Sequence, residues 1–214
     1  MTRRTVSALR ADAQQNRQRI IDAASKLFKR AGIDVPLEDI AREAGVGIAT
    51  LYRRFPNRSE LTAAAFAQQA SVYVDVIDAA TAEPNPWEGL CRLVNGLCEL
   101  QASDAGLRQF VTMTFPDVPE VQEMVDSIES KIESLLDRAK YAGSLRPDAT
   151  TADIVLMLLG NNGILGRSWP QAEVAWRRYA ALFLDSLRPS LESAPLPPAP
   201  SPDTIREALK NPYT

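Results

Sequence analysis

The sequence predicts an all-α protein, and two observations support that fold class. Apolar residues recur at the three- and four-residue spacing of helices along nearly all of the 214 residues. Alternating runs of Val, Ile, Thr and aromatic residues between turns, which would predict strands, are missing. The hydrophobic fraction of 45% and the charged fraction of 24% are those of an ordinary globular protein.

Four helices are expected in the first part of the chain. The first spans about residues 14–31 and stops at Gly32, because glycine favours the conformation that ends a helix. Two short helices follow around Gly45, and a longer one runs from Ser59, as its N-cap, to about residue 80. The apolar stripe of the first helix consists of Ile20, Ala24, Leu27, Phe28 and Ala31.

Five more helices are expected after the helix-breaking segment Pro-Asn-Pro at residues 84–86. They span about residues 87–102, then 104–115 with an acidic N-cap, 120–142, 151–167 and 171–187. The helix at 151–167 is apolar almost all round, which indicates that more apolar faces exist than one chain can cover.

The end of the chain has a different composition. Six of the fourteen residues 189–202 are proline, so we expect an extended linker, and the sequence leaves open whether this tail docks on the body. The predicted organisation is therefore a head at 1–58, a helical body at 59–188 and a Pro-rich tail at 189–214.

The charge is distributed unevenly between head and body. Residues 1–58 hold twelve Lys and Arg against six Asp and Glu, whereas the rest holds twelve against twenty-one. A basic head on an acidic body suits a module that binds phosphates, joined to a domain that does not touch nucleic acid.

Several classes of protein are disfavoured. No apolar run reaches the roughly 18 residues of a membrane span, and residues 1–16 do not read as a secretory signal, so a cytoplasmic protein is expected. Histidine is absent, which removes the commonest general base and metal ligand, so we expect no enzyme, cofactor or metal site. Cys91 and Cys98, seven residues apart in one helix, lie beyond disulfide reach of each other.

The segment Leu37 to Phe55, LEDIAREAGVGIATLYRRF, has the pattern of a helix-turn-helix. Ala41 is small where the second helix crosses, Gly45 permits the tight turn, and Val46 and Leu51 fill the wedge between the helices.

This segment with its flanks, IAREAGVGIATLYRRFPNRSEL, resembles the DNA-binding domain of TetR-family regulators. The resemblance is strong over about the first 66 residues, and beyond them it rests on the number and length of the helices. It implies a three-helix DNA-binding head, a fourth linking helix, and a helical body that binds a small ligand and dimerises.

The resemblance assigns the recognition helix to Ile48–Phe55, whose first residues enter the major groove. Thr50 can hydrogen-bond a base edge, and Arg53 suits guanine or a phosphate. Tyr52 matches a phosphate-contacting tyrosine of the family, and Arg58 stands where the family usually has a phosphate-contacting lysine. Leu51 and Phe55 are interpreted as core residues. The full set of expected DNA contacts is Arg17, Arg19, Gly47, Ile48, Ala49, Thr50, Tyr52, Arg53, Arg54 and Arg58.

Two positions depart from the family pattern. Pro36 replaces a threonine that caps the second helix, and Gly47 replaces a serine that caps the recognition helix. Both helix starts are therefore expected to lack a side-chain cap, and a basic N-terminal arm with Arg3 and Arg4 is a candidate for extra phosphate contacts.

Candidate residues in the body are less specific, because each suits a packed core equally well. Asn95 and Gln101 are candidates to orient a ligand, and nothing in the sequence ranks them. The candidates to line the ligand pocket are Phe66, Tyr73, Leu97, Phe110, Met113, Phe115 and Met124. The candidates for a two-fold interface are Leu156, Leu159, Gly160, Gly163, Ile164, Trp176, Tyr179, Phe183 and Leu184.

These observations and the resemblance predict a regulator that binds palindromic operator DNA as a homodimer, and the family's habit implies a repressor released by a small-molecule effector. The alternative is a ligand-independent architectural or adaptor protein with a helix-turn-helix. A helical enzyme or metal protein built on Asp117, Glu120 and Glu123 is the weakest hypothesis, because these carboxylates suit the solvated first turn of a helix.

Overall fold

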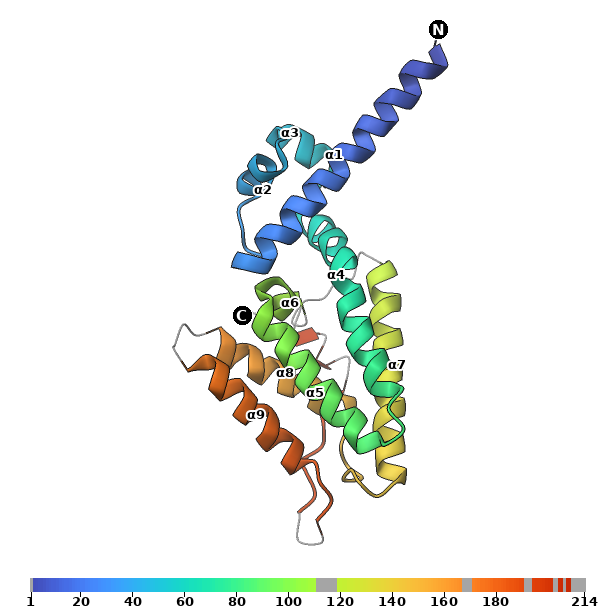
Figure 1. Ribbon diagram of the computed structural model, residues 1–214, viewed down its shortest axis with the longest axis vertical. Helices are drawn as coiled ribbons and strands as arrows, with labels where there is room; N and C mark the ends of the chain where they lie inside the picture. The colour runs from blue at the N-terminus through green and yellow to red at the C-terminus, as the bar shows by residue number, and fades with distance from the viewer. Residues whose placement is uncertain are drawn as a thin grey trace. The chain divides into compact units, whose positions relative to one another are not determined.

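The computed structural model describes residues 2–110, 119–166, 171–190, 194–201, 204–205 and 207–208. Within these residues it contains nine α-helices and no strand, which confirms the all-α fold class (Figure 1). The helices are α1 (Thr2–Ala31), α2 (Leu37–Ala44), α3 (Ile48–Arg54), α4 (Arg58–Thr81), α5 (Pro86–Ser103), α6 (Ala105–Phe110), α7 (Pro119–Tyr141), α8 (Thr151–Leu165) and α9 (Ala172–Ser186). No helix in the described part of the chain is long and apolar enough to cross a membrane.

The chain divides into two compact units. Unit 1 comprises residues 1–70 with 104–107, and unit 2 comprises residues 71–103 with 108–214. Helix α4 continues from unit 1 into unit 2. The boundary between head and body at residue 58 stays a prediction, whereas the packing divides the chain twelve residues later.

Unit 1 is built around the second half of α1, which packs against α2 and α3. The side chains of the apolar stripe predicted for α1 lie in the interior of unit 1, because they recur every three or four residues on one face of the helix. Ala31 is the exception, since it is exposed at the helix end. The core of unit 1 includes Ile20, Ala24, Leu27, Phe28, Ile40, Ala41, Ala44, Leu51, Phe55 and Leu61.

Helix α1 is longer than the sequence pattern indicated. It begins at Thr2 instead of near residue 14, so the residues expected to form an arm continue the helix. Residues 2–13 contain no Gly or Pro, and six of the twelve are Ala or Arg, which have high helix propensity. The apolar stripe alone could not show this extension, because the stripe begins only at Ile20.

Helices α4, α5 and α6 each begin at a capping side chain. The backbone N–H of Glu60 donates to Oδ1 of Asn57 at 2.8 Å, and Nδ2 of Asn57 donates to the Glu60 carboxylate at 2.9 Å. Asn57 therefore caps α4, and the expectation of Ser59 was wrong by two residues. Asn85 caps α5, and Asp104 caps α6 as expected, by accepting the N–H of Leu107 at 2.9 Å. The expected extension of this helix to residue 115 lies outside the described residues.

Unit 2 is organised around α5, which packs against α7, α8 and α9. Helix α8 begins with a reciprocal cap between Thr150 and Asp153, and the backbone N–H of Thr150 donates to the Asp153 carboxylate at 2.7 Å. The core of unit 2 includes Leu90, Leu93, Val94, Leu97, Leu135, Leu136, Ile154, Met157 and Trp176.

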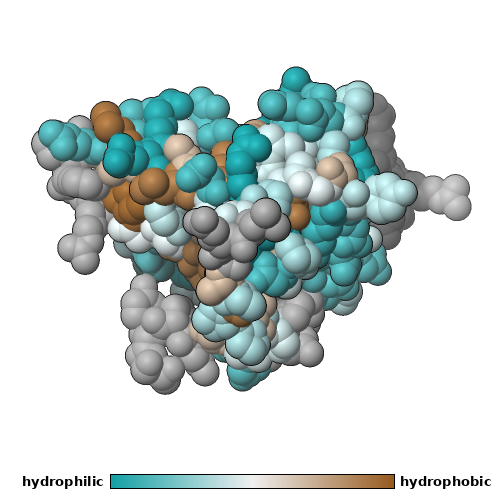
Figure 2. Space-filling view, turned by 90° about the horizontal axis from the view of Figure 1, so that it is seen from below, coloured by the Kyte–Doolittle hydropathy of each residue, from teal (hydrophilic) through white to brown (hydrophobic). Residues whose placement is uncertain are grey.

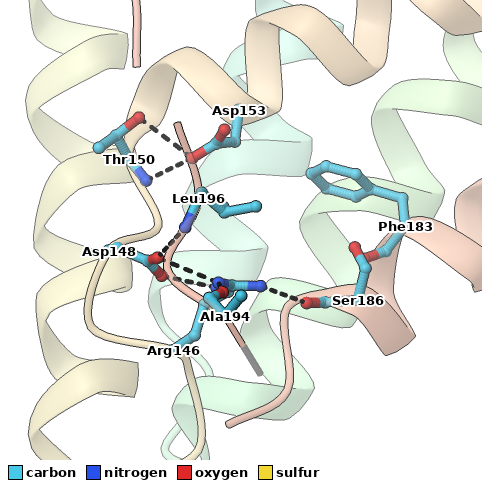
Figure 3. A network of polar contacts seen from close by, with 8 residues as sticks. All are labelled: Arg146, Asp148, Thr150, Asp153, Phe183, Ser186, Ala194 and Leu196. Atoms are coloured by element: carbon cyan, nitrogen blue, oxygen red, sulfur yellow. Dashed lines mark hydrogen bonds and ion pairs between the residues drawn. The ribbon is translucent and has the colours of Figure 1, made fainter. Parts of the chain in front are cut away.

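The Pro-rich tail docks on unit 2, which answers the question that the sequence left open (Figure 3). The guanidinium of Arg146 and the carboxylate of Asp148 form a two-point pair, with nitrogen–oxygen distances of 2.6 and 3.0 Å. Arg146 also donates to the carbonyl of Ala194 at 3.0 Å, and Asp148 accepts the N–H of Leu196 at 2.8 Å. Farther along the tail, Ile205 is buried.

Candidate nucleic-acid interface

The turn between α2 and α3 depends on Gly45. This residue has φ 64° and ψ 36°, the left-handed conformation that glycine adopts without steric cost. The N–H of Val46 donates to the carbonyl of Ala41 at 3.0 Å, and the N–H of Gly45 donates to that of Arg42 at 3.1 Å. These bonds satisfy carbonyls at the end of α2 and direct the chain into α3, so the predicted role of Gly45 is confirmed.

Helix α3 is fixed to unit 1 by two side chains on its inner face. Leu51 is 0% exposed, and Phe55, directly after the helix, is also buried. The interpretation of these two residues as core is therefore confirmed. Because they anchor one face of a seven-residue helix, the opposite face is held in place and turned outward.

The outward face of α3 contains most of the predicted DNA contacts. Ile48 is 37% exposed and Tyr52 is 48% exposed, although both are large side chains with apolar surface. Gly47, Ala49 and Arg53 are exposed as well. Thr50 and Arg54 are half-buried, and Nε of Arg54 is buried without a hydrogen-bond partner. The structure thus brings all seven residues to one short helix, while their contacts with DNA stay a prediction.

Three arginines predicted to contact DNA already interact within unit 1. The guanidinium of Arg17 lies over the ring of Phe55, 5.1 Å from its centroid. Arg19 donates to the carbonyl of Gly45 at 3.4 Å, and Arg58 donates to the carbonyl of Ile33 at 2.6 Å. These interactions could not be predicted from sequence spacing, because each joins residues at least 25 positions apart.

The two helix starts that depart from the family pattern lack side-chain caps, as expected. Pro36 and Gly47 occupy the N-cap positions of α2 and α3, and neither makes a side-chain hydrogen bond there. At α2 the main chain and charge compensate in part. The carbonyl of Pro36 accepts the N–H groups of Asp39 and Ile40, and Glu38 and Asp39 place negative charge in the first turn.

The first half of α4 is tied to α1 by polar contacts within unit 1. The carboxylate of Asp22 accepts hydrogen bonds from Gln18 at 2.9 Å and from Gln68 at 3.0 Å, and these bonds hold the pKa of Asp22 below its usual value. The hydroxyl of Ser25 donates to the carbonyl of Ala65 at 3.3 Å. The first half of α4 is therefore positioned by α1, the helix that also supports the helix-turn-helix.

The predicted pocket residues do not form one cluster within a single unit. Phe66 is buried in unit 1, whereas Tyr73 and Leu97 are buried in unit 2 and Met124 is half-buried there. Met113 and Phe115 lie outside the described residues, as does the side chain of Phe110. A ligand pocket made by these residues stays a prediction.

The two polar ligand candidates have different environments. Asn95 is exposed and donates to the carbonyl of Cys91 in its own helix at 2.8 Å. Gln101 is fully buried and contacts α8, where Nε2 donates to the carbonyl of Leu158 at 3.2 Å. The structure therefore ranks Gln101 above Asn95 as a group inside the body.

The predicted interface residues divide into exposed and interior positions. Leu156 is 45% exposed, Gly163 is exposed, and Leu159, Ile164 and Phe183 are half-buried. Trp176, 1% exposed, and Leu184, also buried, lie in the core of unit 2 instead, because α9 turns them towards α5 and α8. Gly160 and Tyr179 pack against each other within the chain. Trp176 and Leu184 are therefore corrected from interface to core, whereas Gly160 and Tyr179 are half-buried and their place in an interface stays a prediction.

Two exposed apolar residues were missed by the sequence analysis. Val174 is 68% exposed and Leu182 is 58% exposed, both on α9. They are eight positions apart, which places them on the same side of the helix. Figure 2 shows apolar residues gathered on the left of the face it displays, the side on which α8 and α9 lie in Figure 1.

Two family models match the chain. One, described as bacterial regulatory proteins of the tetR family, matches residues 20–65. The other, described as the C-terminal domain of SbtR-like transcriptional regulators, matches residues 85–189. The two matches cover the helix-turn-helix and most of the helical body.

Individual relatives agree with these matches. An HTH-type transcriptional regulator of Staphylococcus aureus (strain USA300) is 46% identical over 54 residues, which are 25% of this chain and 29% of that protein. The TetR transcriptional regulator SCO0520 from Streptomyces coelicolor is 32% identical over 81% of this chain and 99% of its own, with a TM-score of 0.49. RolR, solved in complex with resorcinol, is 18% identical over 93% of this chain and 95% of its own, with a TM-score of 0.57.

Proposed function

Because the chain belongs to the TetR family of bacterial DNA-binding transcription regulators, we propose that it binds palindromic operator DNA as a homodimer and represses transcription until a small-molecule effector releases it. The observation that carries this proposal is the outward face of α3. An exposed Ile48 and Tyr52 beside the exposed Arg53, on a helix anchored by Leu51, suit a helix that enters the major groove.

The contacts divide into those that read bases and those that hold phosphates. Ile48 and Ala49 at the start of α3 present methyl groups suited to thymine, and Thr50 supplies a hydroxyl for a base edge. Tyr52 and Arg58 contact the phosphate backbone of the DNA. Arg53 reaches either a guanine or a phosphate, and the salt dependence of binding distinguishes the two by the number of phosphates neutralised.

The homodimer is proposed to form through α8 and α9. Leu156, Val174 and Leu182 together expose apolar surface on two helices that pack against each other. A two-fold axis beside this surface would bury it against its own copy, and a palindromic operator would then be read by one recognition helix from each protomer.

Effector release is proposed to act through α4, because this one helix runs from unit 1 into unit 2. An effector in the body that tilts α4 would change the spacing of the two recognition helices and so break their match to the operator. The operator-bound and effector-bound dimers must then differ in the spacing of their heads, and identical spacing contradicts this mechanism.

The test begins with genome-wide mapping of the operator and measures its binding by fluorescence anisotropy. We expect Arg53→Ala to weaken binding by about 1–3 kcal/mol, or roughly 5- to 150-fold. Lys29→Ala is the matched control, because Lys29 is an exposed cation on the last turn of α1, and its loss should change the affinity little. Equal losses for the two variants would mean that α3 does not read the operator.

Sedimentation tests the dimer separately. The chain should sediment as a dimer at micromolar concentration, and Leu182→Glu should give a monomer. A wild-type monomer that still binds the palindrome tightly overturns the proposed assembly. Operator binding that no candidate effector changes would favour the alternative, an adaptor that acts without a ligand.

A further inference from the structure

The interior of unit 2 contains a polar pair that the proposed DNA and dimer contacts do not use. Gln101 on α5 and Asn161 on α8 are both 0% exposed. Nδ2 of Asn161 donates to Oε1 of Gln101 at 2.8 Å, and Nε2 of Gln101 donates to the carbonyl of Leu158 at 3.2 Å. Oδ1 of Asn161 has no hydrogen-bond partner, and it is the sole buried side-chain nitrogen or oxygen of this kind among the described residues of unit 2.

The orientation of this acceptor follows from the hydrogen bonds around it. The carbonyl of Leu158 can only accept, so Gln101 must turn its amide nitrogen towards that carbonyl and its oxygen towards Asn161. Asn161 must then present its own nitrogen to the Gln101 oxygen, because the reverse arrangement would oppose two oxygens. Oδ1 of Asn161 is therefore left free by the network, and reassigning the amide atoms does not remove it.

The buried charged residue of this unit does not provide a partner for Oδ1 of Asn161. Arg146 is the buried charged residue among the described residues of unit 2, and its guanidinium is committed to Asp148, Ser186 and Ala194. A buried water usually needs two to four polar partners. Asn161 offers one unpaired acceptor, since the amide groups of Gln101 and the carbonyl of Leu158 are already paired within the network.

The surroundings restrict the chemistry of such a ligand. Leu97 and Cys98 precede Gln101 by four and three positions, and Met157 precedes Asn161 by four, so these side chains share the faces of the amide pair and all are buried. Sγ of Cys98 lies 3.4 Å from Sδ of Met157, and burial raises the pKa of this thiol to about 12, so it is neutral. The flexible thioether of methionine adapts readily to irregular apolar groups, and a buried thiol behaves as a small apolar group.

We propose that Gln101 and Asn161 form the recognition point of the effector site, and that the effector is an uncharged, mainly apolar molecule that donates one O–H or N–H hydrogen bond to Oδ1 of Asn161. This inference rests on the proposed function, since it names the ligand class of a ligand-responsive regulator. A charged molecule would lose its hydration here without meeting an opposite charge, so the site selects against it. A molecule held between α5 and α8 also alters the packing of α8 against α9, the pair that carries the proposed dimer surface.

The test uses three probes of similar size with the full-length chain: phenol, which has a hydroxyl donor; anisole, which has none; and benzoate, which is charged. Binding at millimolar concentration is measured by ligand-observed NMR and calorimetry. We expect phenol to bind about tenfold more tightly than anisole or benzoate, because a buried acceptor left unpaired is costly. Asn161→Leu should abolish the preference for phenol over anisole.

Asn162→Leu is the matched control, because Asn162 is the next residue of α8 and is only half-buried. It should keep the preference for phenol. Circular dichroism verifies the folding of each variant, and Asn161→Met, which is more adaptable, replaces Asn161→Leu if the leucine variant does not fold. The proposal is overturned if the wild-type chain binds phenol and anisole equally, or does not bind phenol. It is also overturned if the variant at position 161 still prefers phenol to anisole.

Operator binding, measured on the same preparations without probe, separates this inference from the proposed function. A wild-type chain that shows no preference for phenol but binds the operator means that the effector is recognised elsewhere. Failure of operator binding with an intact phenol preference means instead that the site exists in a protein whose DNA-binding function was wrongly assigned.

Discussion

Replacing Gly45 by alanine tests whether the geometry of the helix-turn-helix depends on a left-handed glycine. At φ 64° any other L-residue pays a steric cost of about 1–2 kcal/mol, which arises between its Cβ and its own backbone. A Cβ at this position would also lie 2.6 Å from Nη2 of Arg19. Arg19 is exposed and its bond to the Gly45 carbonyl is long, so the guanidinium can move aside and adds little to the cost.

The assay is amide hydrogen exchange at Val46 in the full-length chain, because this N–H donates to the carbonyl of Ala41 only while the turn is formed. A cost of about 1–2 kcal/mol lowers its protection by roughly 5- to 30-fold. Gly45→Asn has the same Cβ, but asparagine tolerates the left-handed region better, so it should lose less protection.

Two results would refute this reasoning. Protection unchanged in Gly45→Ala would mean that the turn tolerates a side chain. Full recovery in the double variant Gly45→Ala with Arg19→Ala would mean that the cost comes from the contact with the guanidinium and not from the backbone conformation.

Three further predictions concern unit 2. Gly160→Ala places a Cβ 2.3 Å from Oη of Tyr179 and should lower the free energy of unfolding, measured in urea, by about 1–3 kcal/mol. The double variant with Tyr179→Phe should recover part of this loss, and additive losses would contradict the prediction. Cys98, whose pKa burial raises to about 12, should react with Ellman's reagent only as fast as the protein opens, and rapid labelling of the native chain would show otherwise. A guanidinium hydrogen bond and the Leu196 N–H hold the pKa of Asp148 below its usual 3.8, so the docked tail should persist as pH falls through the usual Asp range and detach only below it. Asp148→Asn should accelerate exchange of the Leu196 amide at neutral pH, and unchanged exchange would mean that the tail is held elsewhere.

The helix-turn-helix was predictable because its determinants are local. Ala41, Gly45 and Leu51 act through contacts within about ten residues of chain, so their spacing records the geometry directly. The cap of α4 was equally local. Asn57 and Glu60 have the three-residue spacing of a capping box, and that signal could have corrected the choice of Ser59.

The interior of the body was not predictable in the same way. Asn161 bonds to Gln101 from sixty positions away, and no periodicity in either helix indicates that partner. Apolar periodicity identified α8 and α9 as helices with excess apolar surface, but it could not say which side faces α5. Trp176 was therefore assigned to an interface although it lies in the core, while Leu182 was overlooked.

The arginines of unit 1 connect the stability of the head with its proposed contacts to DNA. Arg19 and Arg58 each donate to a main-chain carbonyl of unit 1, in the turn at Gly45 and in the loop at Ile33. A guanidinium carries five N–H donors, so one such bond leaves others for a phosphate. A side chain already held in place loses less conformational entropy when DNA binds. These ordered cations can therefore supply phosphate contacts that offset those lost at the two uncapped helix starts. This compensation does not require an N-terminal arm.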